Sequence, residues 1–256
     1  MEYPSKIVPN PRPLFYFKKR NLNYYSDILE IADTNVHEQV TNVINKMYPE
    51  QPIHILDVAC GKCALSLRIK DSRVKKQLDD EIITLDQMNP VEPVKFPYYQ
   101  MDLNNEEQLE DLVNEYRNYF DIILGIEIIE HLENPKKCLY YLKEMLNDEG
   151  HLLISTPNVN NPMARRIFYK KGRLEQFSEK DLQYGHISII LPHILENIAT
   201  SLTLKIMVEY PVGLYPKFWL YPNIRSLYIT FCNILLPMVK GSWCKLYIFK
   251  KDINER

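Results

Sequence analysis

Short apolar runs alternate with longer amphipathic segments along most of this chain. The runs, rich in Ile, Leu and Val, have the length of buried strands, whereas the longer segments repeat apolar residues at helical spacing. Strands are predicted at 53–58, 81–86, 97–101, 120–125, 151–156, 204–209 and 243–250. Helices are predicted at 25–32, 36–48, 64–69, 106–117, 136–146 and 191–202, with a turn at 147–150. This alternation favours an α/β fold built on a mostly parallel sheet.

The loop after the first predicted strand is built from small residues. Ala59, Cys60 and Gly61 allow a sharp turn between the strand and the helix that follows. Such a turn leaves backbone N–H groups at the helix N-terminus free to face a ligand. We therefore expect a ligand-binding loop here.

This loop resembles the first motif of class I S-adenosylmethionine (SAM) dependent methyltransferases, whose usual pattern is Asp-x-Gly-x-Gly-x-Gly. Asp57 and Gly61 match that pattern, and Ala59 and Cys63 occupy the outer glycine positions. The resemblance implies a Rossmann-like, seven-stranded, mostly parallel sheet with helices on both faces, an antiparallel last strand and cap insertions. It also implies that Asp57, Ala59 and Gly61 bind SAM.

Further cofactor-binding residues are expected where later strands end. An acid at the end of the second strand accepts hydrogen bonds from ribose hydroxyls in clefts of this kind, which favours Asp86, together with the adjacent Gln87. The resemblance places Asp102 and Leu103 at the adenine ring and Ile126 in the same cleft. Asp102 is also a candidate N-cap of the following helix, a role compatible with the first.

The segment after the fourth strand, IEIIEHLENP, carries the most specific motif in the chain. It resembles the ExxEH(L/V)xxP segment of methyltransferases related to the ubiquinone-biosynthesis O-methyltransferases and to the small-RNA 3′-terminal 2′-O-methyltransferases. In the RNA enzymes the matching residues bind a metal ion. The resemblance therefore implies a metal site at Glu127, Glu130, His131 and the later His186.

Two chemistries are open at these residues, because an acceptor hydroxyl must lose a proton during O-methylation. His131 or His186 can act as a general base, since imidazole titrates near neutrality. Alternatively, the two carboxylates and two imidazoles hold Mg²⁺, Mn²⁺, Fe²⁺ or Zn²⁺, which lowers the pKa of the acceptor hydroxyl.

The cysteines permit other interpretations. Cys60-Gly61-Lys62-Cys63 is a CxxC sequence between a strand and a helix, as in thioredoxin-like oxidoreductases. That fold needs a proline-led strand to close over the cysteines, and none follows clearly. A zinc site is disfavoured because Cys138, Cys232 and Cys244 are scattered.

Composition limits which binding partners and which cellular compartment we expect. The net charge of −2 gives no general basic surface, which argues against nucleic acid as a partner. An odd number of cysteines without framework spacing, and no basic and apolar leader, favour a cytoplasmic location. The charge-free run 226–239 is shorter than the ~20 residues that span a bilayer, which favours a core or lid helix over an interfacial helix that admits a lipid-linked acceptor.

We expect one methyltransferase domain over residues 1–256. Residues 1–50 form an arm and a helical cap, 51–156 the cofactor-binding half, and 157–202 and 211–242 the substrate-side insertions. The predicted acceptor is a small molecule, a sugar or a cell-envelope or capsular polysaccharide precursor. The alternatives are RNA-terminal 2′-O-methylation and a non-catalytic protein of the same fold. Basic residues of the first insertion either hold a phosphate or carboxylate or form a solvated helix face: Arg165, Arg166, Lys170, Lys171 and Arg173.

Overall fold

A seven-stranded sheet forms the centre of the computed structural model, which describes residues 23–30, 32, 35–90, 95–213, 224–235 and 242–252. The strands lie in the order β5-β4-β3-β6-β7-β9-β8. β9 is antiparallel to both neighbours and the other adjacent pairs are parallel, which confirms the predicted fold. The strands are β3 His54–Val58, β4 Glu81–Asp86, β5 Tyr98–Gln100, β6 Phe120–Ile126, β7 Leu146–Pro157, β8 Leu204–Val212 and β9 Cys244–Lys251.

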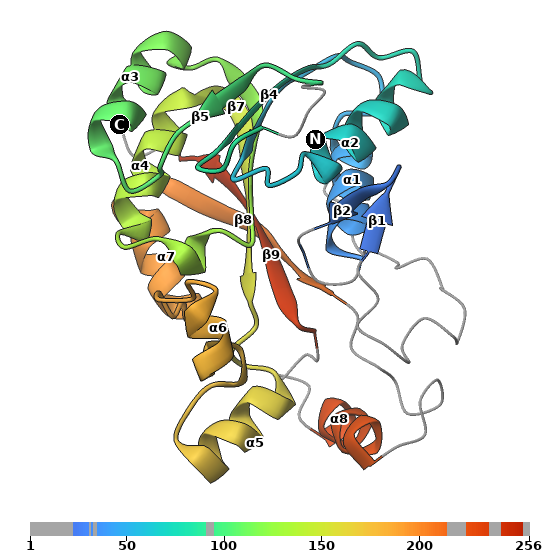
Figure 1. The fold of residues 1–256 in the computed structure, drawn as a ribbon, viewed down its shortest axis with the longest axis vertical. Coiled ribbons are helices and arrows are strands. Elements are labelled where there is room, and N and C mark those ends of the chain that lie inside the picture. Colours follow the sequence, from blue (N-terminus) through green and yellow to red (C-terminus); the bar gives the residue numbers. More distant parts are fainter. Residues whose placement is uncertain are drawn as a thin grey trace.

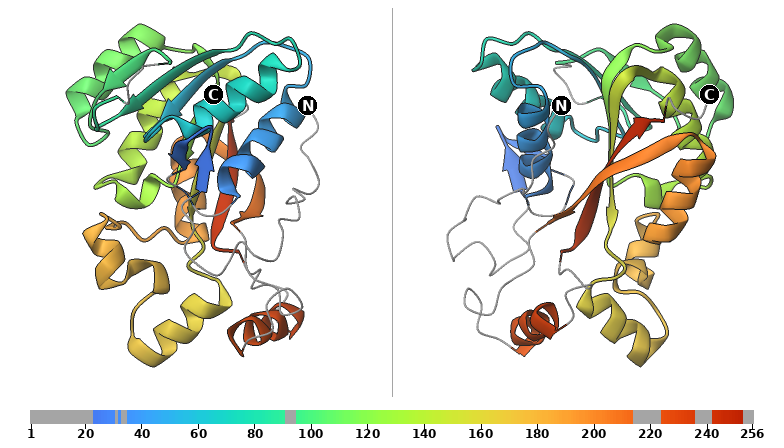
Figure 2. Two further views of the ribbon diagram at one scale, coloured as in Figure 1. Left: turned by 45° about the vertical axis from the view of Figure 1, so that its right-hand side comes forward. Right: turned by 180° about the vertical axis from the view of Figure 1, so that it is seen from behind.

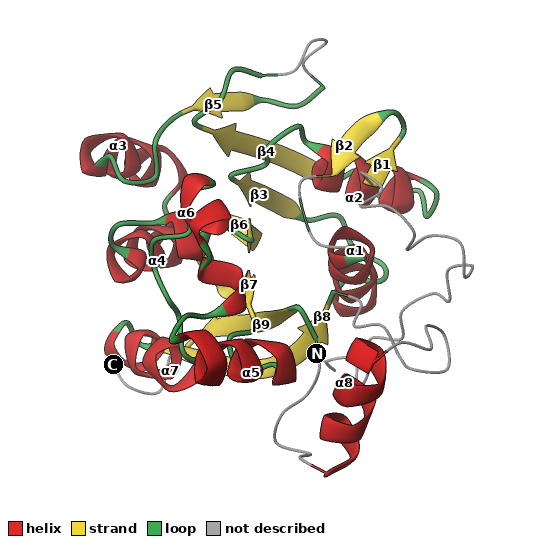
Figure 3. Ribbon diagram, turned by 60° about the horizontal axis from the view of Figure 1, so that its bottom comes forward, coloured by secondary structure: helices red, strands yellow, loops and turns green. Residues whose placement is uncertain are grey.

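Helices cover both faces of the sheet (Figures 1 and 2). On one face lie α1 Val36–Met47 and α2 Ala64–Val74, and on the other α3 Glu106–Tyr116, α4 Pro135–Met145 and α7 Pro192–Ser201, as Figure 3 shows along the sheet. Within β3, Ile55 packs with the α1–α2 side, whereas Leu56 and Val58 pack with the α3–α4 side. Because both faces of the strand are buried, its apolar residues point to both sides of the sheet.

Smaller elements lie beyond the carboxyl end of β7 (Figure 1). They are α5 Pro162–Lys171, the 3-10 turn Glu175–Phe177, α6 Glu179–Gln183 and α8 Ile224–Leu235. Another 3-10 turn, Ile129–His131, follows β6. None of the helices in the described part of the chain is long and apolar enough to cross a membrane. Residues 1–22, which belong to the predicted arm and helical cap at 1–50, lie outside the described residues. The same holds for 214–223 and 236–241 of the predicted insertion 211–242.

The predicted helix at 25–32 is wrong. The chain instead forms a hairpin of β1 Asn23–Tyr25 and β2 Ile28–Glu30, whose turn residues Ser26 and Asp27 have φ of 44° and 66°. A two-residue turn with positive φ at both positions matches the twist of paired strands. Glu30 then fixes the hairpin to α2, because its Oε1 accepts from Nε and Nη2 of Arg68 at 3.1 and 2.6 Å.

The predicted turn at 147–150 is part of β7. The pairing with β6 shifts register between Phe120 and Ile122, so the four residues form an irregular bulge within the strand. Asn147 Nδ2 donates to Asp121 Oδ1 at 2.7 Å across this bulge. The turn-forming residues therefore accommodate an irregularity in the strand and do not end it.

Candidate functional site

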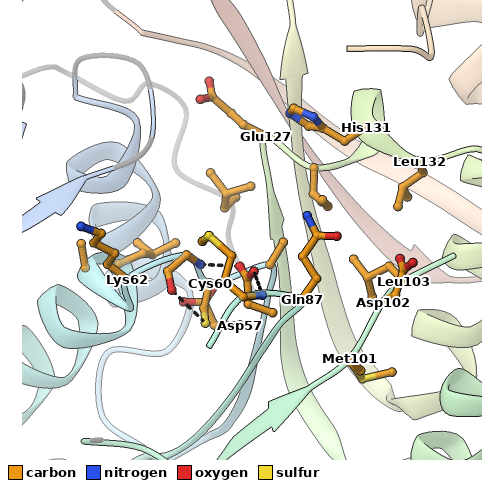
Figure 4. Close-up of a pocket in the computed structure, with 18 of the residues that line it drawn as sticks. Asp57, Cys60, Lys62, Gln87, Met101, Asp102, Leu103, Glu127, His131 and Leu132 are labelled. Atoms are coloured by element: carbon orange, nitrogen blue, oxygen red, sulfur yellow. Dashed lines mark hydrogen bonds between the residues drawn. The ribbon is translucent and has the colours of Figure 1, made fainter. Parts of the chain in front are cut away.

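A cavity of about 250 Å³ opens at the carboxyl ends of β3, β4 and β6 (Figure 4). Ligands of open α/β sheets bind in this position. All of the residues predicted to contact SAM line the cavity: Asp57, Ala59, Gly61, Asp86, Gln87, Asp102, Leu103 and Ile126. Their contacts with a cofactor stay a prediction, but the fold brings them to one place.

The loop between β3 and α2 keeps an unusual backbone conformation. Ala59, Gly61 and Cys63, which occupy the three glycine positions of the motif, have φ of 54°, 55° and 58°. A non-glycine residue in this left-handed region costs roughly 1–2 kcal/mol. The loop therefore retains the conformation that glycine favours even where alanine and cysteine have replaced it.

Asp86 connects this loop to the end of β4. Its Oδ2 accepts from the Gly61 N–H at 2.8 Å, and its Oδ1 accepts from the Met88 N–H at 2.9 Å. The side chain is almost fully buried at the cavity wall. Asp86 thus orders the loops that a bound ribose would contact.

Asp57 lies at the base of the same loop. Its carboxylate is buried and accepts a hydrogen bond from the Ser66 hydroxyl on α2. Burial raises the pKa of Asp57 to about 6, against the opposing effects of the Ser66 hydrogen bond and of His37. The carboxylate therefore titrates much closer to neutrality than an exposed aspartate does.

The predicted adenine side of the cavity follows β5. Asp102 Oδ1 accepts from the Asn104 N–H at 2.9 Å and so closes a tight turn. The N-cap of α3 is Asn105, whose side chain accepts from the Gln108 N–H at 3.2 Å. The alternative role of Asp102 as helix N-cap is therefore wrong, because α3 begins three residues later than that role requires.

Three of the four predicted metal ligands come together. Glu130, His131 and His186 each place one ligand atom within 4.8 Å of the others. The segment after α6 is held there because the N–H groups of Ile187 and Ser188 both donate to the Glu130 carbonyl at 2.9 Å. These three residues form a compact cluster of one carboxylate and two imidazoles. His131 of this cluster lines the cavity.

The protonation of this cluster follows from its contacts. His186 Nδ1 lies 2.8 Å from the carbonyl oxygen of Gln176, and a carbonyl can only accept, so Nδ1 carries a hydrogen and donates it. Burial, and secondarily the nearby His186, lowers the pKa of His131, against hydrogen bonds to the backbone of Gly185 and Tyr184. His131 is therefore neutral near pH 7 and able to accept a proton.

Glu127, the fourth predicted ligand, does not belong to this cluster. Its N–H donates to Ser155 Oγ at 2.9 Å, and its Oε1 accepts from the Cys244 thiol at 2.7 Å. The residue has φ of 54°, and Figure 4 shows its carboxylate turned away from His131. The reversed backbone at Glu127 thus directs the side chain toward β9.

Sequence reasoning missed other residues of the cavity wall. His37 extends from α1 and Leu29 from the hairpin, whereas Tyr184 follows α6. The apolar spacing of 36–48 correctly predicted a helix, and a polar His37 on its buried side was the available signal of a ligand-facing position. No sequence signal marked Leu29, because the hairpin that carries it was predicted as a helix.

Known proteins resemble the chain in sequence over part of its length. Residues 32–206 match the model of a family described as methyltransferase domain. The mitochondrial ubiquinone biosynthesis O-methyltransferase of Dictyostelium discoideum is 24% identical over 160 residues, which are 57% of this chain and 47% of that protein. The enzyme of the same description from Saccharomyces cerevisiae is 28% identical over 141 residues, 53% of this chain and 44% of that protein. The chain thus spans about half the length of these curated relatives.

Solved structures share the fold at low sequence identity. A SAM-dependent methyltransferase from Archaeoglobus fulgidus is 18% identical, with a TM-score of 0.50 over 84% of this chain and 94% of that one. The 1,6-didemethyltoxoflavin-N1-methyltransferase of Burkholderia thailandensis, solved with S-adenosylhomocysteine, is 10% identical, with a TM-score of 0.51 over 85% and 79%. The [4+2]-cyclase SpnF has the same TM-score at 12% identity over 84% and 81%. These likenesses establish the architecture alone.

Proposed function

Because the chain belongs to the family of methyltransferase domains, we propose that it transfers the methyl group of SAM to a hydroxyl oxygen of its acceptor. The observation that carries this proposal is the position of His131, a half-buried imidazole with a lowered pKa in the wall of the cavity that the predicted cofactor-binding residues line. The O-methyltransferases among its sequence relatives support the choice of oxygen. The thioredoxin-like alternative is set aside, because the sheet is seven-stranded and matches methyltransferase folds.

Methyl transfer from a sulfonium is an in-line displacement, so the protein contributes alignment and exclusion of water. SAM supplies an electrophilic methyl group when bound. The hydrogen bond from the Gly61 N–H to Asp86 fixes the loop on the side of the cavity where the cofactor would bind. His131 takes the proton of the acceptor hydroxyl, and His186, whose Nδ1 donates to the Gln176 carbonyl, packs against it and positions it.

A divalent metal ion is the second candidate for activating the acceptor. The donor set of Glu130, His131 and His186 suits such an ion and would hold it without Glu127. The ion would lower the pKa of an acceptor hydroxyl. Removal of metal separates the two candidates: full turnover after chelation with EDTA supports His131 as base, and loss restored by added Mn²⁺ or Zn²⁺ supports the metal.

The proposed acceptor is a small molecule, a sugar or a polysaccharide precursor. Tyr184, which is 67% exposed, lines the cavity. Outside the cavity, α5 exposes Phe168 and Tyr169 together with Lys170 and Lys171. Aromatic faces beside cationic side chains suit a ring or sugar that carries a phosphate or carboxylate. The net charge of −2 disfavours an RNA acceptor.

Incubation of the protein and SAM with separate pools of metabolites, glycan precursors and RNA tests the proposal. Mass spectrometry should detect a product heavier by one methylene group in a metabolite or glycan pool, and none with the His131→Ala variant. Methylation confined to the RNA pool, with salt-sensitive binding, would favour the RNA-terminal alternative. No methylated product in any pool, with cofactor bound, would favour a non-catalytic protein.

A further inference from the structure

We propose that Cys60 and Cys63 form a reversible disulfide that weakens cofactor binding by reshaping the loop between β3 and α2. Their sulfur atoms lie 3.4 Å apart, and both thiols are free and partly accessible. Cys60 lines the cofactor cavity (Figure 4). The pair is therefore a modification site within the cofactor loop, separate from the His131 cluster.

The backbone already holds the two cysteines at a distance that a disulfide spans. The Cys63 N–H donates to the Cys60 carbonyl at 2.9 Å, which closes a tight turn. Such a turn brings the two Cα atoms within about 7 Å, and disulfides join Cα atoms roughly 4.4–6.8 Å apart. A modest rotation of the side chains is enough to bring the sulfurs to bonding distance.

The two thiols differ in reactivity. The hydrogen bond between the two thiols lowers the pKa of Cys63 and raises the pKa of Cys60. Cys63 also immediately precedes α2, and the N-terminus of a helix favours a thiolate. Cys63 is thus the nucleophile of the pair and Cys60 the resolving thiol.

A peroxide oxidises the pair in two steps. The Cys63 thiolate attacks one peroxide oxygen, the O–O bond breaks, and hydroxide leaves as Cys63 becomes a sulfenic acid. Cys60 then attacks the Cys63 sulfur, the S–S bond forms, the S–O bond breaks, and water leaves. Two thiols have lost two electrons and two protons, and one peroxide has become two waters.

The disulfide changes a loop whose contacts are all close to the cofactor cavity. Between the cysteines lies Gly61, whose N–H donates to Asp86, and the Cys60 N–H donates to the Leu85 carbonyl at 3.0 Å. Drawing the sulfurs together moves the Cys60 side chain at the wall and strains these hydrogen bonds. We therefore expect oxidation to lower the affinity for S-adenosylhomocysteine by at least about tenfold, the effect of losing one such hydrogen bond.

Trypsin offers a direct readout, because Lys62 lies between the two cysteines. Cleavage after Lys62 places Cys60 and Cys63 on different peptides, which stay joined only through a disulfide. The full-length protein is treated with hydrogen peroxide, digested, and analysed by mass spectrometry with and without reductant. The expected result is a linked peptide pair that reductant separates, absent from the Cys63→Ser variant.

Cys138 provides the matched control. Its thiol is 3% exposed, and burial raises its pKa to about 12, so it should not react. The Cys138→Ser variant should form the Cys60–Cys63 linkage as the wild type does, and circular dichroism confirms that each variant folds. Over-oxidation of Cys63 without any linked pair would overturn the proposal.

Isothermal titration with S-adenosylhomocysteine on reduced, oxidised and re-reduced protein tests the consequence. We expect affinity to fall on oxidation and to return on reduction. An unchanged affinity in protein with the linkage formed would overturn the proposed effect on cofactor binding. The disulfide is detected without cofactor, so its absence would count against the proposed linkage alone. Binding of S-adenosylhomocysteine is measured first on reduced protein, so an absence of binding there would count against the proposed function.

Discussion

The ring centroids of His131 and His186 lie 4.7 Å apart in a T-shaped contact, although His131 follows β6 and His186 follows α6. The contact depends on the Glu130 carbonyl, which accepts from two consecutive N–H groups of the later segment. The backbone thus fixes the relative position of two histidines from distant parts of the chain. Such positioning is what a general base requires.

His131→Ala should lower kcat by about 10²–10⁴-fold, the usual contribution of a positioned base. Because the Asp86–Gly61 contact is untouched, the affinity for S-adenosylhomocysteine should change much less. Steady-state kinetics and calorimetry measure the two effects. His193→Ala, at an exposed position on α7, is the control and should leave kcat unchanged. Equal losses in both His variants would contradict the assignment.

The pH dependence of kcat should have its acid limb below the usual pKa of a histidine, because the pKa of His131 is lowered. Burial lowers the pKa of His131, so the neutral imidazole persists below its usual range and is protonated only as the pH falls through the lowered pKa. A stopped assay in a constant-ionic-strength buffer series measures the profile. An acid limb centred above the usual histidine pKa would require another base.

Asp86→Ala should weaken binding of S-adenosylhomocysteine by about 10–100-fold. The change removes a carboxylate that accepts from the backbone of both flanking loops, and a hydrogen bond to a charged group contributes about 1.5–3 kcal/mol. Calorimetry measures the affinity. Asp79→Ala is the matched control, since that acid is 96% exposed and pairs only with Lys70 among the described residues. An equal effect of the two substitutions would contradict the role of Asp86.

Ala59→Gly should leave the free energy of unfolding unchanged or raise it by up to about 1.5 kcal/mol. Glycine relieves the left-handed strain at Ala59, worth roughly 1–2 kcal/mol, and loses about 0.5–1 kcal/mol through chain entropy. Ala64→Gly, at the start of α2, lacks such strain and should destabilise by about 1 kcal/mol. Urea unfolding compares the two. Equal destabilisation would mean that Ala59 is not strained.

Strand ends were the most predictable part of the site. Asp57, Asp86 and Ile126 lie at or near the carboxyl ends of parallel strands, which meet at one edge of a sheet, so their proximity follows from the predicted strands. The choice of Asp57 and Ile126 as cofactor residues came from the family resemblance. The positions of His131 and His186 came from the resemblance, because nothing in their local sequence indicates a contact between distant segments.

The remaining features depend on backbone conformation and on tertiary contacts. The positive φ at Glu127 turns its side chain toward Cys244. A glutamate does not predict a positive φ, so no sequence signal indicated this turn. Likewise, the hairpin replaced a predicted helix because Glu30 pairs with Arg68, which lies on another element. In the hairpin, a tertiary contact thus opposed the local helical pattern.

Binding of S-adenosylhomocysteine to the reduced wild-type protein, measured by isothermal titration calorimetry, tests the central claim most directly. A cofactor cavity at the carboxyl ends of β3 and β4 predicts saturable heat with one site per chain, strongly reduced in Asp86→Ala and retained in Asp79→Ala. The absence of heat, together with an unchanged melting temperature in the presence of ligand, would contradict the assignment of this cavity to SAM.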